Sequence, residues 1–197
     1  MRIPMARASH WRSCPFESEV AGHGTEQVRR LGHERHWLEA GRILFRQTDS
    51  SRGVYVLTRG LVAIRRVAPT GESMIVRLVF PVGVVGLEAA LGSGLHASEA
   101  VALTDAHVCV LNRSRVQNLL AGDPALNNAL LRRLAADLVA AEEGVLTVGQ
   151  LPVRQRCLQL LRRLADYSLA EPRPAARENG VQFDLPMSHQ ELAMVLG

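Results

Sequence analysis

Short apolar runs recur between Gly41 and Leu111, and turn-forming residues separate them. The runs are rich in β-branched and aromatic side chains and are bounded by Gly, Asp, Ser, Thr or Pro, a pattern typical of short strands. They cover residues 43–45, 54–57, 61–64, 74–80, 100–102 and 107–111. This spacing predicts an antiparallel roll or barrel, with hairpin turns at Gly60 and at residues 69–71. Residues 1–38 lack the pattern and are interpreted as an irregular leader, with a short helix near residues 27–31.

The period of the apolar positions changes after Asn112. Residues 114–120 are typical of a short helix, and Asp123 followed by Pro124 indicates an N-cap and a first helical position. A long helix is predicted over residues 124–148, because apolar residues recur there at alternating spacings of three and four. They are Leu131, Leu134, Leu138, Ala141, Val145 and Val148. This heptad stripe favours a dimer interface with a second copy of the chain. The alternative is a helix that lies on its own roll.

The C-terminal part predicts two more helices. Pro152 opens the first, with Val153, Cys157, Leu160, Leu161 and Leu164 on its apolar face. A short strand is expected over residues 181–185. Ser188 is a good N-cap, Glu191 can complete a capping box, and an apolar stripe follows, which is typical of the first helix of a winged helix-turn-helix. The sequence stops at Gly197, so we expect a chain truncated within that motif, without the second helix that reads the major groove.

Composition adds modest constraints. The 197 residues carry a net charge of +4, and all 23 basic residues are arginine. A basic balance fits a nucleic-acid partner, and it equally fits a mildly basic soluble protein. The three cysteines form no disulfide framework and no signal peptide is recognisable, so the expected compartment is the cytoplasm. No apolar run is long enough to span a membrane, and no membrane partner is expected.

The order of roll, long helix and helix-turn-helix resembles the Crp/Fnr family of bacterial transcription regulators. The resemblance is carried by residues 41–45 with Asp49, 54–60, 80–98, 102–109 and 183–193, and residues 80–98 are most similar to the Fnr branch. It implies an α+β chain in three parts. These are a sensor domain over 1–122, built as an antiparallel, cyclic-nucleotide-binding-like jelly roll with the leader, a dimerisation helix over 123–150, and an incomplete winged helix-turn-helix over 151–197.

The resemblance also implies a function. The expected protein is a homodimeric DNA-binding regulator whose effector-sensing roll is coupled to a helix-turn-helix. A full-length form would have promoter DNA and RNA polymerase as partners. The alternative is a truncated sensor and dimerisation module that binds no DNA and acts as a dominant-negative partner. An enzyme is not expected, because the strands carry no His-x-His pair and the chain has no P-loop or HExxH motif.

Family members that bind cyclic AMP hold its phosphate with an arginine beside a serine or threonine, and its ribose with a glutamate. The resemblance places the corresponding effector pocket at Gly86, Glu88, His96 and Ser98. The arginine position falls on His96 or Ala97, and Glu88 is one residue out of register. A neutral histidine cannot supply a permanent bidentate cation, so cyclic-nucleotide binding is not expected. In the alternative interpretation Glu88 and Ser98 only cap loops of the roll.

Oxygen-sensing members bind a [4Fe–4S] cluster through four cysteines. Cys14 and Cys109 match two of those positions, and no thiol stands at the other two, near Met5 and Ala8. A native cluster is therefore not expected, and the two cysteines are interpreted as redox thiols or a cluster remnant. The alternative for Cys109 is a buried strand residue. No metal site is predicted from the histidines of the leader, and no cofactor is predicted.

A final set of residues is expected to lie near DNA. It consists of Arg154, Arg156, Ser188, His189 and Gln190. Arginine contacts to phosphate would supply affinity and salt dependence without reading the base sequence. The alternative for the arginines is a solvated helix face.

Overall fold

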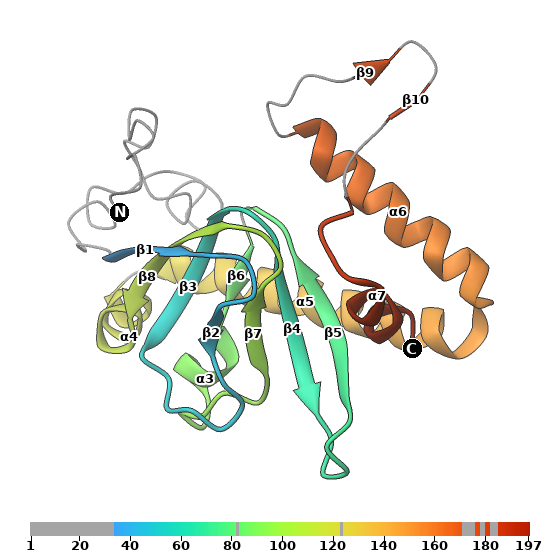
Figure 1. Cartoon of the computed structure of the whole chain (residues 1–197). Coiled ribbons are helices and arrows are strands. Elements are labelled where there is room, and N and C mark those ends of the chain that lie inside the picture. Colours follow the sequence, from blue (N-terminus) through green and yellow to red (C-terminus); the bar gives the residue numbers. More distant parts are fainter. Residues whose placement is uncertain (1–33, 82, 123, 171–175, 178–179, 182–184) are drawn as a thin grey trace.

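Two antiparallel sheets form a roll in the first part of the chain (Figure 1). The computed structural model describes residues 34–197 except 82, 123, 171–175, 178–179 and 182–184. In the first sheet the described strands follow the order β1 (Glu34–Leu38), β8 (Ala106–Asn112), β3 (Gly53–Arg59) and β6 (Val84–Val85). In the second the order is β2 (Ile43–Phe45), β7 (Glu99–Ala102), β4 (Val62–Val67) and β5 (Ser73–Val79). The predicted antiparallel roll is confirmed.

Strand β3 shows why the apolar runs lack strict alternation. Its residues are buried on both faces, because one face meets the opposite sheet and the other meets helices. Tyr55 and Leu57 point into the core between the sheets, whereas Val54 and Val56 join a second core outside the first sheet. A strand covered on both sides has a continuous apolar sequence, which is the pattern found at residues 53–57.

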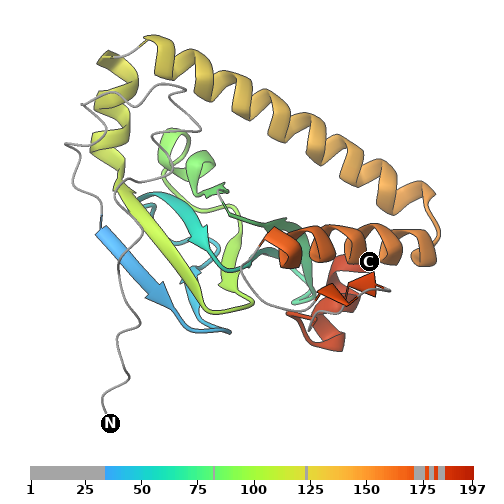
Figure 2. The ribbon, with the colours of Figure 1, turned by 90° about the horizontal axis from the view of Figure 1, so that it is seen from above.

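Helices cover the outer faces of both sheets. The described helices are α3 (Leu87–Leu91), α4 (Arg113–Gly122), α5 (Pro124–Gln150), α6 (Val153–Ala170) and α7 (His189–Leu196). The side chains of Val116 in α4 and Leu130 in α5 pack on the outer face of the first sheet. Helix α5 then runs along one side of the roll and α6 turns back towards it (Figure 2). No helix in the described part of the chain is apolar over a length that could cross a bilayer.

The outer face of the second sheet is covered by the C-terminal helices. Leu160 and Leu164 of α6 are buried against Leu61, Ala63, Ile75 and Leu78, and α7 packs against β5. The predicted capping box of α7 is confirmed, since the Ser188 side chain accepts from the Glu191 amide and the Glu191 carboxylate accepts from the Ser188 amide. Before α7, the two-residue strands β9 (Ala176–Arg177) and β10 (Gly180–Val181) pair with each other. Only Val181 of the expected 181–185 strand is therefore in a described strand.

Three expectations are corrected. Residues Glu34–Leu38 are not part of an irregular leader but form β1, an edge strand paired with β8. Gly60 does not close a hairpin, because β3 and β4 belong to different sheets. Its φ of +91° and its close approach to the backbone of Asp105 make it the corner at which the chain passes between the sheets. Glu88 is not in a loop but in the first turn of the short helix α3. The proposed leader helix near residues 27–31 lies outside the described residues.

Candidate functional site

The turn from β6 into α3 brings two of the predicted effector-pocket residues together. Gly86 has φ of +79°, and a Cβ atom there would lie 3.1 Å from the Tyr55 ring and 3.2 Å from His96 Cε1. His96 and Ser98 are buried, whereas Glu88 is exposed on α3. Gly86 thus allows the backbone to approach the His96 ring closely. A side chain at position 86 would push the His96 ring away.

His96 is the centre of an aromatic cluster. Its ring stacks on Phe45 with centroids 3.7 Å apart, and the Tyr55 ring centroid is 6.3 Å away. The side chain is 2% exposed, and neither ring nitrogen has a hydrogen-bond partner among the described residues. Burial lowers the pKa of His96, and the negative charges of Glu88 and Asp49 oppose this effect. The imidazole is therefore neutral at pH 7.

Phe45 and Tyr55 were not predicted as site residues. Each is an aromatic residue that points into the core from its strand. This aromatic character was the only feature of the sequence that could have marked them as site residues. Which ring meets which depends on the pairing of distant strands, which a single sequence does not display.

The predicted pocket residues do not fit a cyclic phosphodiester. Such a group needs a permanent cation with two aligned donors, and Gly86, Glu88, His96 and Ser98 supply none. His96 is neutral, and its ring and that of Tyr55 fill the space beside Gly86. Ala97, the other residue at the expected arginine position, has an exposed methyl side chain.

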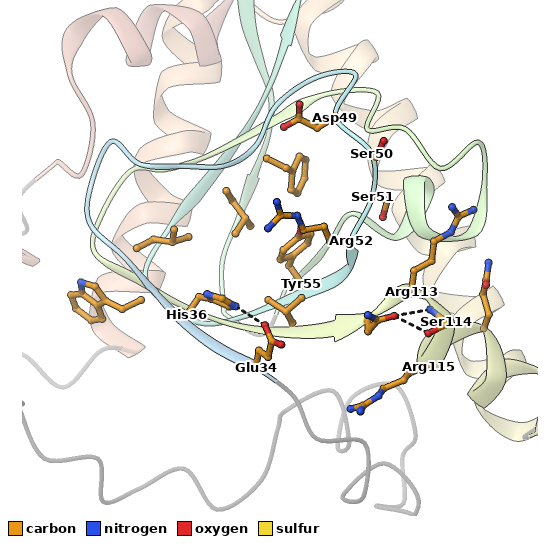
Figure 3. Close-up of a pocket in the computed structure, with 17 residues that line it drawn as sticks. Glu34, His36, Asp49, Ser50, Ser51, Arg52, Tyr55, Arg113, Ser114 and Arg115 are labelled. Carbon is orange, nitrogen blue, oxygen red and sulfur yellow. Dashed lines mark hydrogen bonds and ion pairs between the residues drawn. The ribbon is translucent and has the colours of Figure 1, made fainter.

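A separate, broad pocket of about 1450 Å³ opens between strands β1 and β2. Strand β1 contributes Glu34 and His36, and the segment before β3 contributes Asp49 and Arg52, with Tyr55 on the pocket floor. Figure 3 shows the Arg52 side chain reaching across the pocket beside Tyr55. Sequence reasoning missed this pocket, because it assigned β1 to an irregular leader.

The predicted dimer stripe on α5 is exposed in the single chain. Leu131, Leu134, Leu138, Val145 and Val148 have exposed fractions between 37% and 72%, and Ala141 is also exposed. Contacts with the roll come from a different side of α5. Leu130 is buried, and Asp137 lies 3.5 Å from Arg77 of β5 and 3.2 Å from Arg133 of the same helix. The alternative in which the stripe lies on its own roll does not match these exposures.

The residues expected near DNA divide into two groups. Arg154, His189 and Gln190 are exposed, and Ser188 is exposed while it caps α7. Arg156 is partly buried instead, and its Nη1 lies 3.1 Å from where a Cβ of Gly197 would stand. Arg156 therefore lies at the carboxyl end of α7, where a cation is favourable.

The described cysteines and histidines do not come together in a metal site. Cys109 is buried in β8, on the face of the first sheet that meets α3, α4 and α5, and Cys157 is partly buried in α6. Cys14 and His33 are outside the described residues. Within the part of the chain that the structure describes, no three His, Cys, Asp or Glu side chains are grouped so that they could hold a metal ion.

The double-sheet roll with its short α3 helix defines the class of domain. Residues 35–123 match the family model of the cyclic nucleotide-binding domain. The chain is 32% identical over 173 residues to a probable transcriptional activator of Rhizobium leguminosarum, covering 87% of this chain and 69% of the relative. It is 27% identical to the transcriptional activator protein FnrL of Cereibacter sphaeroides, covering 81% of this chain and 62% of that protein.

A solved structure supports the same fold. FixK2 from Bradyrhizobium japonicum aligns with a TM-score of 0.70 at 22% identity, covering 84% of this chain and 78% of FixK2. The chain belongs to the Crp/Fnr family of transcription regulators. The relatives are named as regulators of transcription, which points to a regulatory role and away from catalysis.

Proposed function

We propose that this regulator acts as a homodimer in the cytoplasm, held together by α5, with a roll that receives a signal and C-terminal helices that approach promoter DNA. The observation that carries the proposal is the exposed apolar stripe of α5. The helix has 27 residues, a length of about 40 Å at 1.5 Å per residue. The stripe extends from Leu131 to Val148, about 25 Å of that length. An apolar stripe in water is stabilised when a second copy covers it.

Sedimentation equilibrium of the 197-residue polypeptide tests the dimer. We expect wild type to be dimeric at about 10 µM, and Leu138→Glu to weaken association by about 100-fold, because it places a charge within the stripe. Ala136→Glu is the matched control, since residue 136 is exposed on the opposite side of α5. A monomeric wild type, or equal weakening by both variants, contradicts the proposal.

The signal received by the roll is proposed to be something other than a cyclic nucleotide. The lack of a cation at the predicted pocket supports this, as does the packing of Tyr55 and His96 beside Gly86. A ligand at 100 times its dissociation constant stabilises a folded protein by about 2.7 kcal/mol. Cyclic AMP and cyclic GMP at 1 mM are expected to leave the midpoint of thermal unfolding unchanged, and a clear rise with either nucleotide contradicts this part of the proposal.

DNA contact is proposed to begin at Arg154 and at the exposed start of α7, formed by His189 and Gln190. Sequence reading would require a second helix after α7, and RNA polymerase would be a partner of a form that includes it. Residues 1–197 by themselves are expected to bind DNA weakly and without sequence preference. In a gel shift, retention should disappear as salt rises from about 50 to 200 mM. Nanomolar, sequence-specific retention would contradict this expectation.

A further inference from the structure

Two edge strands border the pocket of the roll. Strand β1 is the edge of the first sheet and β2 is the edge of the second, and the broad pocket lies between them. Its floor is apolar and includes Leu38, Leu44, Phe45, Tyr55 and Val110. These side chains also pack on or belong to the core between the sheets. An apolar group in the pocket would therefore contact the core of the roll directly.

The rim of the pocket is basic. Three arginines line it, Arg52, Arg113 and Arg115, against two acidic residues, Glu34 and Asp49. Both carboxylates already have partners. Glu34 lies 3.4 Å from His36 Nε2, and Asp49 accepts a hydrogen bond from the Arg46 amide at 2.9 Å. The acidic residues thus leave an excess of positive charge at the rim.

Arg52 differs from its neighbours on the rim. Arg113 is fixed, because its Nε–H donates to the Ala90 carbonyl at 3.0 Å and its amide donates to the Arg52 carbonyl at 3.1 Å. The guanidinium of Arg52 has no hydrogen-bond or ion-pair partner in the described part of the chain. Figure 3 shows the Arg52 side chain within the pocket, next to Tyr55.

We propose that this pocket binds an amphipathic organic carboxylate, with its acid group on the Arg52 guanidinium and its apolar body on the floor formed by Leu38, Leu44 and Tyr55. A guanidinium and a carboxylate match as a planar pair with two parallel hydrogen bonds. An apolar body gains from the removal of its surface, and that of the floor, from water. Pockets that bind small ligands combine apolar side chains with polar groups that fix orientation, and side chains of both kinds line this pocket.

Octanoate is a suitable probe, and three compounds isolate its features. Acetate keeps the carboxylate without the tail, 1-octanol keeps the tail without the charge, and inorganic phosphate tests a simple anion. Trp37 lines the pocket, and Trp11→Phe leaves it as the only tryptophan, so its fluorescence reports on binding. For a ligand of this size we expect octanoate to bind with a dissociation constant of about 1 mM or below. The other three compounds should bind at least about tenfold more weakly.

Two arginine variants in the same background complete the test. Arg52→Gln should weaken octanoate binding by at least about tenfold, the loss expected when a charged hydrogen-bond partner is removed. Arg66→Gln, an exposed change in β4 outside the pocket, should leave binding within about twofold of wild type and controls for net charge. Unchanged unfolding midpoints establish that both variants fold.

Equal binding of octanoate to wild type and Arg52→Gln overturns the proposal, as does octanol or phosphate binding as tightly as octanoate. Failure here leaves the proposed dimer intact, because the pocket lies on the roll and the dimer stripe on α5. The two proposals are tested by different readouts, fluorescence titration and sedimentation.

Discussion

His96 stacks on Phe45 with ring planes inclined by only 9°, although neither of its nitrogens has a hydrogen-bond partner among the described residues. A buried polar group without a partner costs about 1–3 kcal/mol of stability. The close approach of the Gly86 backbone and the parallel stacking on Phe45 therefore hold the polar His96 ring in an apolar environment. This relationship gives the first prediction.

His96 is expected to make stability depend on pH. Burial lowers its pKa below the ordinary 6.5, so the unfolded chain binds a proton more readily than the folded one. The stability contributed by neutral His96 is complete above pH 6.5 and is lost as the pH falls below that value. We expect the free energy of unfolding of wild type to fall between about pH 7 and about pH 5.

His96→Phe keeps the stack and removes the titrating group. The variant should lose part of the pH slope, while His107, whose pKa is also lowered by burial, retains the rest. At pH 7 its free energy of unfolding should be unchanged or higher by about 1 kcal/mol, because two unpaired nitrogens are removed. Urea denaturation at fixed protein concentration measures both effects. A slope identical to that of wild type would show that His96 does not titrate as described.

Gly53 is expected to tolerate no side chain. A Cβ atom there would collide with the carbonyl oxygen of Leu111 in the paired strand β8, which cannot move without breaking the sheet. Gly53→Ala should destabilise the roll by at least about 3 kcal/mol, among the large effects of single substitutions. Gly41→Ala is the control, because its φ is +80° but nothing lies within 4 Å. Its cost should be about 1–2 kcal/mol, from the backbone alone.

Leu164 is expected to hold the C-terminal helices on the roll. It is fully buried where α6 meets Leu61 and Leu78, in the core that α7 also joins. Leu164→Ala should lower the free energy of unfolding by about 2–5 kcal/mol, and Leu158→Ala, on the exposed side of α6, by less than about 1 kcal/mol. Hydrogen exchange supplies a local readout. Amides of α6 and α7 should exchange faster in Leu164→Ala while those of β3 do not, and uniform loosening would refute a local role.

The pattern of apolar positions predicted the elements whose signals are local. Residues 43–45 form β2 with the predicted bounds, Pro124 begins the long helix, and Ser188 with Glu191 caps α7. In each case the sequence signal lies within a few residues along the chain. The spacing also predicted that Leu138 and its heptad neighbours share one side of α5, and the structure shows that this side is exposed in the single chain.

Features that depend on distant partners were missed. Strand β1 is polar and mostly exposed, so only its pairing with β8 shows that it is a strand. Gly60 was interpreted as a hairpin because its neighbours are strands, and the change of sheet at that point has no local signature. The pocket between β1 and β2 could not be found for the same reason. Its lining comes from segments as far apart as Glu34 and Arg113, which only the fold brings together.

Strand β5 contacts both of the helices on which regulation would depend. Arg77 pairs with Asp137 of α5, and Ser73, at the beginning of the same strand, donates its hydroxyl proton to the Met194 sulfur of α7 at 3.7 Å. A displacement of this one strand would change a contact to the helix that carries the proposed dimer stripe and a contact to the capped C-terminal helix at the same time. In the proposed regulator, a signal bound by the roll would need no separate route to each of these helices.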